Sequence, residues 1–249
     1  EFELLSIQIP GNIIETYTTN WASVSKTLYE YKNLGNILKS AIYITPDAEM
    51  LKKSYSDDNE LLIEAFNFIK HKFRWNGYLD KFASNFHRKA YIDGVGNSAD
   101  INLSLVTLYR KLGFESYPVV LSTRNNGFID DDRPSIHDLN YVIALVIKDG
   151  ERLLFDATEY YAAPNFLPAR CINGKGLIVQ QNIASWVDLD NYGTNKKQIA
   201  YDLILDTIGN FDGKSFKNDN PPSQTLWMDY GADNYAGVSW FNAPNNRRI

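Results

Sequence analysis

The spacing of apolar side chains predicts a long, buried helix over residues 98–112. Apolar residues recur there every three or four positions, which is the repeat of one helix face, and others stand beside that stripe. The stripe is Ile101, Leu105, Leu108 and Leu112, flanked by Leu103 and Val106. So wide an apolar surface is typical of a helix that is covered on most sides, and Gly113 follows it as a C-terminal stop. We expect this helix to lie at the centre of the domain.

Three further helices are predicted earlier in the chain. Asn20 is a favourable N-cap for a helix that begins at Trp21, and a short second helix is expected over residues 36–41. A stronger helix is expected over residues 58–73, where Asp57 and Asp58 place negative charge at the N-terminus. The apolar stripes behind the first and third helices are Trp21, Val24, Leu28 and Tyr31, and Leu62, Phe66, Ile69 and Phe73.

The strand-like segments follow the central helix. Residues 114–123 form a continuous run of β-formers typical of an inner strand. Residues 139–148 and 152–156 are expected to pair as a hairpin across an Asp-Gly turn at Asp149 and Gly150. A short strand is also expected over Ser6–Pro10. The pattern therefore predicts an α+β fold in which a buried central helix packs on an antiparallel sheet.

The chain of 249 residues favours one sizeable domain with a small appendage. We place the core at residues 1–190, with N-terminal helices followed by the helix and sheet. A β-leaning C-terminal extension is expected at residues 191–249. It contains a strand over residues 197–206, which alternate in polarity, and then an irregular tail rich in Asn, Gly and Pro.

The composition narrows the function classes. A net charge of −5 without a basic run argues against nucleic acid as a partner, and no apolar stretch approaches the roughly 20 residues of a transmembrane helix. A single cysteine, Cys171, excludes an internal disulfide and a multi-cysteine zinc site, and we interpret it as a semi-buried structural thiol. The first residues lack a signal peptide and begin within strand-like sequence, so we expect an internal fragment of a longer chain.

Aromatic residues are unusually frequent, with 16 Tyr, 13 Phe and 5 Trp. They are interpreted either as large amphipathic side chains of the core and its rim or as a surface groove for sugars or peptides.

The acidic clusters do not match a metal site. Asp130–Asp132 resemble part of a calcium loop but lack the glycine and the distal glutamate of the EF-hand spacing, and Asp188 with Asp190 fails the same test. We expect solvated acidic loops, no bound metal and no cofactor.

Several short motifs recur in an order that resembles a known family. They are Trp75-Asn76-Gly77, the run 96–102 (Gly-Asn-Ser-Ala-Asp-Ile-Asn), the run 121–124 (Leu-Ser-Thr-Arg), Asp156-Ala157-Thr158 and the run 173–176 (Asn-Gly-Lys-Gly). Together they span roughly residues 15–190 and resemble the transglutaminase-like superfamily, especially bacterial proteins in which this core follows a β-rich domain of unknown function. The resemblance implies a papain-like core with a Cys-His-Asp triad. It also implies export, and hence a periplasmic or cell-surface location.

Two of the three triad positions hold a different residue here. The resemblance places Ser98 where the family has cysteine, Tyr141 where it has histidine, and Asp156 at the retained aspartate. A serine hydroxyl is a weak nucleophile without an adjacent base, and tyrosine, with a pKa near 10, is a poor base at neutral pH. We expect the phenol of Tyr141 to hydrogen-bond with Asp156 or Ser98. Asn140 is the alternative match if the register shifts by one residue.

Other polar or aromatic residues near these positions are candidate binding residues. His137 precedes Tyr141 by four residues, about 13 Å along a strand, which is too far for it to act as a replacement base. The other imidazoles, of His71 and His87, lie outside the motifs and are interpreted as core or surface residues. Asp100 suits a helix cap, Asn102 could reach into the cleft, and Trp75 could wall it or pack in the core.

The sequence therefore predicts a catalytically inactive transglutaminase-like domain that binds a peptide, protein or glycan. Two alternatives remain open. One is an amidase, protease or acyl-transferase that uses Ser98, and the other is a purely structural module that positions neighbouring domains of a longer chain.

Overall fold

The computed structural model describes residues 6–7, 15–16, 20–190, 209–211 and 216–218. The chain forms two compact units, Glu1–Asn195 and Lys196–Ile249, and each is described by itself. In the second unit, β10 (Gly209–Phe211) and β11 (Phe216–Asn218) form an antiparallel pair. The predicted strand over residues 197–206 lies outside the described residues.

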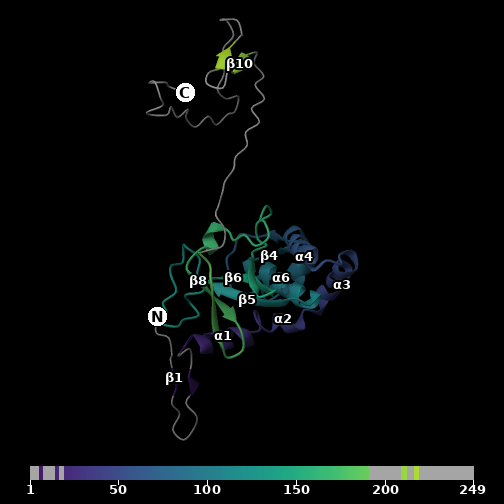
Figure 1. Ribbon diagram of the computed structural model, residues 1–249. Coiled ribbons are helices and arrows are strands. Elements are labelled where there is room, and N and C mark those ends of the chain that lie inside the picture. The colour runs from purple at the N-terminus through teal and green to yellow at the C-terminus, as the bar shows by residue number, and fades with distance from the viewer. Residues whose placement is uncertain (1–5, 8–14, 17–19, 191–208, 212–215, 219–249) are drawn as a thin grey trace, which may run out of the picture. The chain divides into compact units, whose positions relative to one another are not determined.

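The first unit is built on a five-stranded antiparallel sheet with the order β7-β6-β5-β8-β9 (Figure 1). Its strands are β5 (Glu115–Leu121), β6 (Tyr141–Lys148), β7 (Glu151–Phe155), β8 (Lys175–Val179) and β9 (Ala184–Asp188). The predicted inner strand and hairpin are confirmed as β5, β6 and β7. Asp149 and Gly150 both have positive φ, 53° and 82°, as a two-residue hairpin turn requires.

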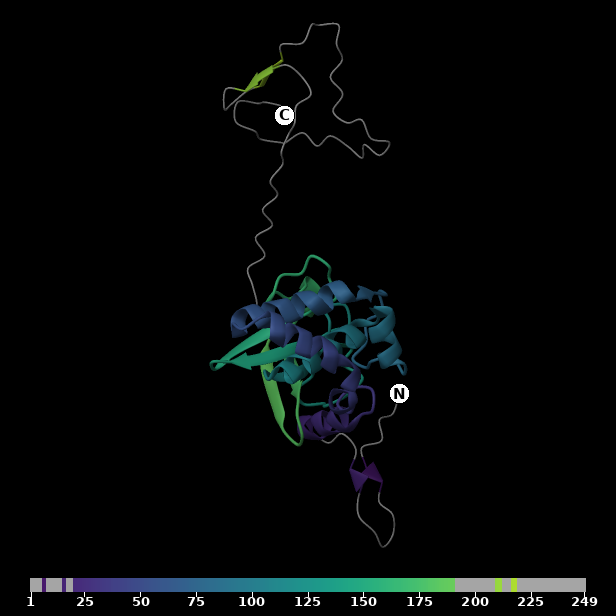
Figure 2. The ribbon, with the colours of Figure 1, turned by 90° about the vertical axis from the view of Figure 1, so that its right-hand side faces the viewer.

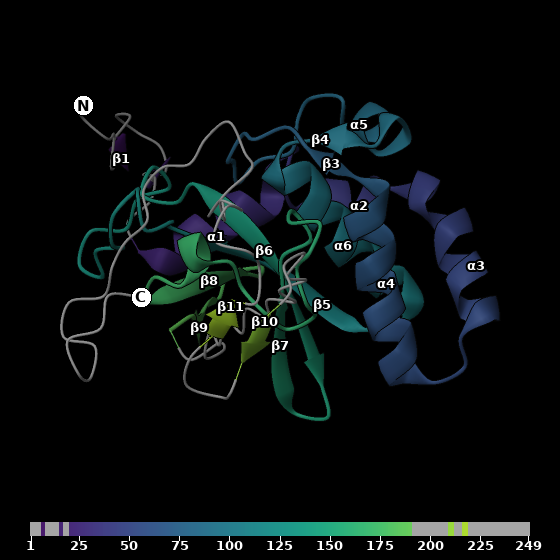
Figure 3. The ribbon, with the colours of Figure 1, turned by 90° about the horizontal axis from the view of Figure 1, so that it is seen from above.

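The central helix α6 (Ser98–Leu112) has the bounds that the apolar pattern predicted. Asn97 and Asp100 form a capping box at its N-terminus, and Gly113 ends it with a φ of 102°. One side of α6 packs on β5 and β6, and α3 (Thr45–Ser54) and α4 (Asp58–Lys72) cover other sides (Figure 3). The helix is therefore buried because elements surround it on several sides.

Two other predicted helices are confirmed as α1 (Trp21–Glu30), capped by Asn20, and α2 (Ile37–Ser40). The predicted helix over residues 58–73 is α4. Helix α1 packs against β8 and β9 at the far end of the sheet from β7 (Figure 2).

Several short elements were not predicted. They are α3, α5 (His87–Asp93), the 3-10 helices η1 (Ile42–Ile44) and η2 (Ala169–Cys171), and strands β8 and β9. Trp75 and Gly96, both within the motifs of the sequence, belong to the parallel pair β3 (Arg74–Trp75) and β4 (Val95–Gly96). Ser6–Ile7 forms β1, paired with β2 (Glu15–Thr16), and the rest of the predicted strand over residues 6–10 lies outside the described residues.

The sheet separates two apolar clusters. Along β6, Val142, Ala144 and Val146 belong to the cluster that contains the α6 side chains. Tyr141, Ile143 and Leu145 belong to a second cluster with Leu167 and Cys171, because successive side chains of a strand point to opposite faces. Within the described part of the chain, no helix is both long and apolar enough to cross a bilayer.

Candidate functional site

Ser98, the first residue of α6, is fully buried. Its hydroxyl donates to the carbonyl of Asp80 at 2.9 Å and accepts from the backbone N–H of Asp80 at 2.8 Å. The backbone N–H of Ser98 donates to the carbonyl of Tyr78 at 3.1 Å. The segment that follows β3 therefore lies over the position where the family resemblance expects a reactive thiol.

Two side-chain hydrogen bonds hold this covering segment, residues 76–82, in place, one from the N-terminus of α6 and one within the segment. The Asn97 amide donates to the carbonyl of Phe82 at 3.0 Å, and the Asp80 carboxylate accepts from the N–H of Phe82 at 2.9 Å. Gly96 is required just before the helix, because a Cβ there would lie 2.5 Å from the Cβ of Asp100. Residues 76–82 therefore cover the N-terminus of α6.

Tyr141 and Asp156 form the expected hydrogen bond. The phenol donates to Oδ2 of Asp156 at 2.8 Å, and both residues are fully buried. Burial first, and then the charge of Asp156, raise the pKa of Tyr141 well above its ordinary value. Tyr141 therefore stays protonated at neutral pH and serves as a donor.

The Asp156 carboxylate is satisfied by other donors as well. Its Oδ1 accepts from the Asn102 amide at 3.1 Å, and from the backbone N–H and hydroxyl of Thr158 at 3.0 and 2.7 Å. The Cys171 thiol donates to Oδ2 at 3.6 Å. A carboxylate offers about four lone-pair sites, so these groups use its full accepting capacity.

Asn102 is a buried connector rather than a group that reaches into a cleft. Its amide also donates to the carbonyl of Val142 at 2.9 Å, and its carbonyl accepts from the N–H of Ala157 at 2.9 Å. It has no exposed surface. Asn102 therefore ties α6 to β6 and to the end of β7.

Arg170, a residue that the sequence analysis missed, completes the site. Its guanidinium carbon lies 4.8 Å from the Trp75 ring centroid and 5.5 Å from that of Tyr141. Nη1 donates to Glu159 at 2.6 Å, and Nη2 donates to Thr158 at 2.7 Å. Nη2 also lies 3.6 Å from Oδ2 of Asp156. Arg170 therefore occupies the space between Trp75 and Tyr141 and brings a positive charge to the buried carboxylate.

The thiol of Cys171 lies beside the same carboxylate but is not reactive. The residue is fully buried rather than semi-buried as predicted. Burial first, and then Asp156, raise the pKa of the thiol well above its ordinary value. Because the thiolate is the nucleophilic form, Cys171 does not replace the missing nucleophile.

The remaining predicted binding residues have structural partners. The indole N–H of Trp75 donates to the carbonyl of Tyr78 at 3.0 Å, and the Asn140 amide donates to the Thr123 hydroxyl at 2.9 Å. His137 is exposed, and its backbone N–H donates to the Ser135 hydroxyl. The hydrogen bonds of the described residues do not link His137 to Ser98.

The acidic residues weighed as metal ligands lie in turns and ion pairs. Asp130 pairs with Arg133 at 3.0 Å, and Asp131 pairs with Lys175. Asp190 accepts from the N–H of Gly174 at 2.8 Å. In the described ranges, no three His, Cys, Asp or Glu residues are grouped as metal ligands would be.

Comparison of the sequence with known proteins gives a short match to an enzyme. No family model matches the chain. A segment of 44 residues is 58% identical to the levanase of Bacillus subtilis (strain 168). It covers 17% of this chain and 6% of the levanase, so the chain spans only a small part of that enzyme.

Comparison of the structure shows the fold. A candidate protease from Parabacteroides distasonis ATCC 8503 matches 76% of this chain with a TM-score of 0.51 at 13% identity, and 35% of that protein is covered. A candidate cysteine protease from Cytophaga hutchinsonii matches 47% of this chain and 37% of its own, with a TM-score of 0.35 at 12% identity. The second likeness is too weak to carry an argument. The chain has an α+β fold that it shares with the first of these proteins.

Proposed function

We propose that the first unit is a non-catalytic member of the transglutaminase-like, papain-like group that serves as a binding module. One observation carries this proposal. The Ser98 hydroxyl exchanges both of its hydrogen bonds with the backbone of Asp80, and the Tyr141 phenol donates to Asp156. Neither group is arranged to attack a substrate or to accept a proton.

The chemistry of acyl transfer supports this reading. A serine nucleophile needs a base that removes its proton, and a base must lie within about 3.2 Å of that proton's oxygen. In the described residues, the Ser98 oxygen contacts backbone groups of Asp80 instead. The raised pKa of Tyr141 keeps its phenol protonated, so the residue at the family's histidine position cannot supply the base.

The active-enzyme alternative has one residue in its favour. Lys81 follows Asp80 directly, and burial lowers the pKa of its amine, with Asp80 partly opposing the shift. Its Nζ donates to the carbonyl of Leu139 at 2.7 Å. A lysine with a lowered pKa is a candidate general base, so an activity test must include a serine-lysine mechanism.

Among the ligand classes, we propose a glycan. Exposed aromatic rings flank the site along the chain: Tyr78 lies in the segment over Ser98, and Tyr160 and Tyr161 directly follow Glu159, the ion-pair partner of Arg170. Their exposed fractions are 73%, 61% and 94%, and such amphipathic rings suit sugar faces. Levan is the first polysaccharide to test, because a segment of the chain as a whole matches a levanase.

The test of inactivity uses a fluorophosphonate probe and a panel of amide and ester substrates. Wild type, Ser98→Ala and Lys81→Met should give equally low signals. A signal that is present in wild type and lost in both variants would establish the serine-lysine enzyme instead. A double variant, Ser98→Cys with Tyr141→His, should gain thiol reactivity towards iodoacetamide if the triad frame is intact.

The test of glycan binding is a pull-down on levan, with a peptide library measured in parallel. Tyr161→Ala combined with Tyr78→Ala should weaken retention at least tenfold. Phe128→Ala, which removes a ring exposed to 82% in the loop between β5 and β6, is the matched control and should leave retention unchanged. Retention on neither levan nor peptides would favour the purely structural module.

A further inference from the structure

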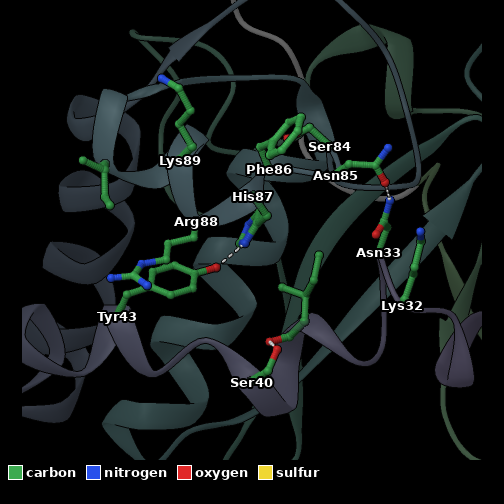
Figure 4. Close-up of a pocket in the computed structure, with 12 residues that line it drawn as sticks. Lys32, Asn33, Ser40, Tyr43, Ser84, Asn85, Phe86, His87, Arg88 and Lys89 are labelled. Carbon is green, nitrogen blue, oxygen red and sulfur yellow. Dashed lines mark hydrogen bonds between the residues drawn. The ribbon is translucent and has the colours of Figure 1, made fainter.

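A second region of the first unit has the features of a ligand site and is not part of the site around Asp156. A pocket of about 510 Å³ lies between the chain segment from α1 to η1 and the segment that leads into α5. Figure 4 shows Tyr43, His87 and Arg88 on one side of it, and Lys32, Asn33 and Asn85 on the other. Its volume falls in the range of about 300–1,000 Å³ that is typical of small-molecule sites.

The lining of this pocket is cationic. Lys32, Arg88 and Lys89 contribute positive side chains, and no Asp or Glu is among the lining residues. Lys89 is paired with Asp93, whereas the ion pairs of the described residues include neither Lys32 nor Arg88. The whole chain has a net charge of −5, so the local positive charge is opposite to the average. Clustered charge of one sign in a concave site attracts ligands of the other sign.

The side chains at the floor of the pocket, Tyr43 and His87, are neutral and already hydrogen-bonded, and the buried Asp100 carboxylate lies next to them outside the lining. His87 Nε2 lies 3.2 Å from the carbonyl of Asp100, which can only accept, so this nitrogen carries the proton. His87 Nδ1 is then the acceptor for the phenol of Tyr43. The Asp100 carboxylate accepts from the N–H and hydroxyl of Ser84, each at 3.0 Å. The floor therefore gives the pocket its shape, and the positive charge comes from the side chains of the rim.

The rim also offers hydrogen-bonding and apolar groups. Asn33 donates to Asn85 at 2.9 Å on one side of the pocket, and the donor hydrogens of the Asn85 amide remain directed away from that bond. The Phe86 ring and the Ile92 side chain, exposed to 74% and 66%, add apolar surface. An anion with a compact organic body fits this combination better than a bare inorganic ion.

We propose that this pocket binds a small organic anion, in which a carboxylate or phosphate group contacts Lys32 and Arg88 and the body of the ligand packs on Phe86. Arginine suits either group because its planar guanidinium pairs with two oxygens at once. A carboxylate and a phosphate make the same kind of contact here, and the experiment separates the two sources. This site does not depend on the proposed inactivity at Ser98 or on glycan binding near Arg170.

The test is a titration of the whole chain with glucuronate, glucose 6-phosphate and glucose, followed by calorimetry and by NMR of the imidazole protons. The chain has 3 histidines, and variants His71→Gln and His137→Gln assign the His87 signal by elimination. We expect saturable binding of glucuronate or glucose 6-phosphate that shifts the His87 signal. Glucose should bind at least tenfold more weakly. The tighter of the two anions identifies the carboxylate or the phosphate as the preferred group.

Charge variants locate the site. Lys32→Gln with Arg88→Gln should weaken binding of the preferred anion at least tenfold, and both residues are exposed, so the fold should tolerate the change. Lys26→Gln with Lys53→Gln removes the same charge from exposed positions outside the pocket and should leave binding unchanged. Absence of saturable anion binding, equal binding of glucose, or equal losses in the two double variants would each overturn the proposal.

Discussion

Two faces of α6 carry two buried polar networks, and only one of them borders open space. Ser98 and Asn102 are four residues apart. Ser98 bonds to the covering segment, and Asn102 bonds to Asp156. Asp100 and Ser104 are also four residues apart and meet His87. An offset of two residues turns a helix by about 200°, so one helix supports both networks on nearly opposite sides.

The first network is closed and the second borders a pocket. Asp156 is surrounded by donors, and Arg170 fills the adjacent space. On the other face, Tyr43 and His87 bond to each other and still line an open cavity. The comparison teaches that the network around Ser98 and Asp156 is the more completely buried of the two, and that the network around His87 borders open space.

The largest effect should come from the two buried aspartates, one on each face. Asp156→Ala leaves the phenol, amide, hydroxyl and guanidinium donors around it without an acceptor. We expect a loss of about 3–5 kcal/mol in unfolding free energy, measured by urea denaturation. Asp100→Ala should cost less, because its donors lie in a segment that water can reach. A larger loss for Asp100→Ala would reverse the ranking of the two networks.

Asn102→Ala should have the next largest effect. The change leaves the carbonyl of Val142 and the N–H of Ala157 unpaired in the core. We expect a loss of about 2–3 kcal/mol in unfolding free energy, again by urea denaturation. Ser104→Ala is the control on the other face and should cost about 1 kcal/mol. Equal costs would mean that the two faces are equally dependent on their buried polar groups.

Tyr141→Phe keeps the ring and removes only the phenol oxygen. Asp156 retains its other donors, so we expect a loss of about 1–2 kcal/mol, seen as a lower midpoint in thermal unfolding. Tyr43→Phe is the matched change, because its phenol donates to His87. A Tyr141→Phe variant more stable than wild type would show that the closed network is strained.

The smallest expected effect is the response of the pocket network to acid. Burial lowers the pKa of His87 from 6.5, with Asp100 partly opposing the shift. Below pH 6.5 the unfolded chain therefore takes up a proton that folded His87 does not. Stability should fall as the pH drops from 6.5 towards the lowered pKa, by at most about 1.4 kcal/mol per pH unit. Urea denaturation at pH 7.5, 6.5 and 5.5 measures this slope. It should be shallower in His87→Gln and unchanged in His137→Gln.

The sequence predicted the elements whose signals are local. Helix α6 was found with its bounds because Asn97, Gly113 and the apolar stripe mark it along the chain. Strands β8 and β9 were missed because residues 180–183, which connect them, lack the Asp-Gly turn signal that marks the hairpin of β6 and β7. Helix α3 was missed because its buried apolar side chains are only Ala48 and Leu51.

The candidate site was predicted in part for the same reason. The pairing of Tyr141 with Asp156 followed from the motif positions, since both residues stand where a family pattern places them. Arg170 carries no such pattern, and its role depends on Trp75, which lies far away in the sequence and becomes a neighbour only in the folded chain. His87 was assigned to core or surface because its partners, Tyr43 and Ser104, lie 44 and 17 residues away along the chain.

The position of Arg170 next to Cys171 in one 3-10 turn affects any titratable side chain placed at position 141. Both side chains reach Asp156 from that turn. A histidine returned to position 141 would gain a proton beside a guanidinium, and like charges at close range oppose each other. The guanidinium should therefore lower the pKa of a histidine placed at position 141, and removal of the arginine should raise it.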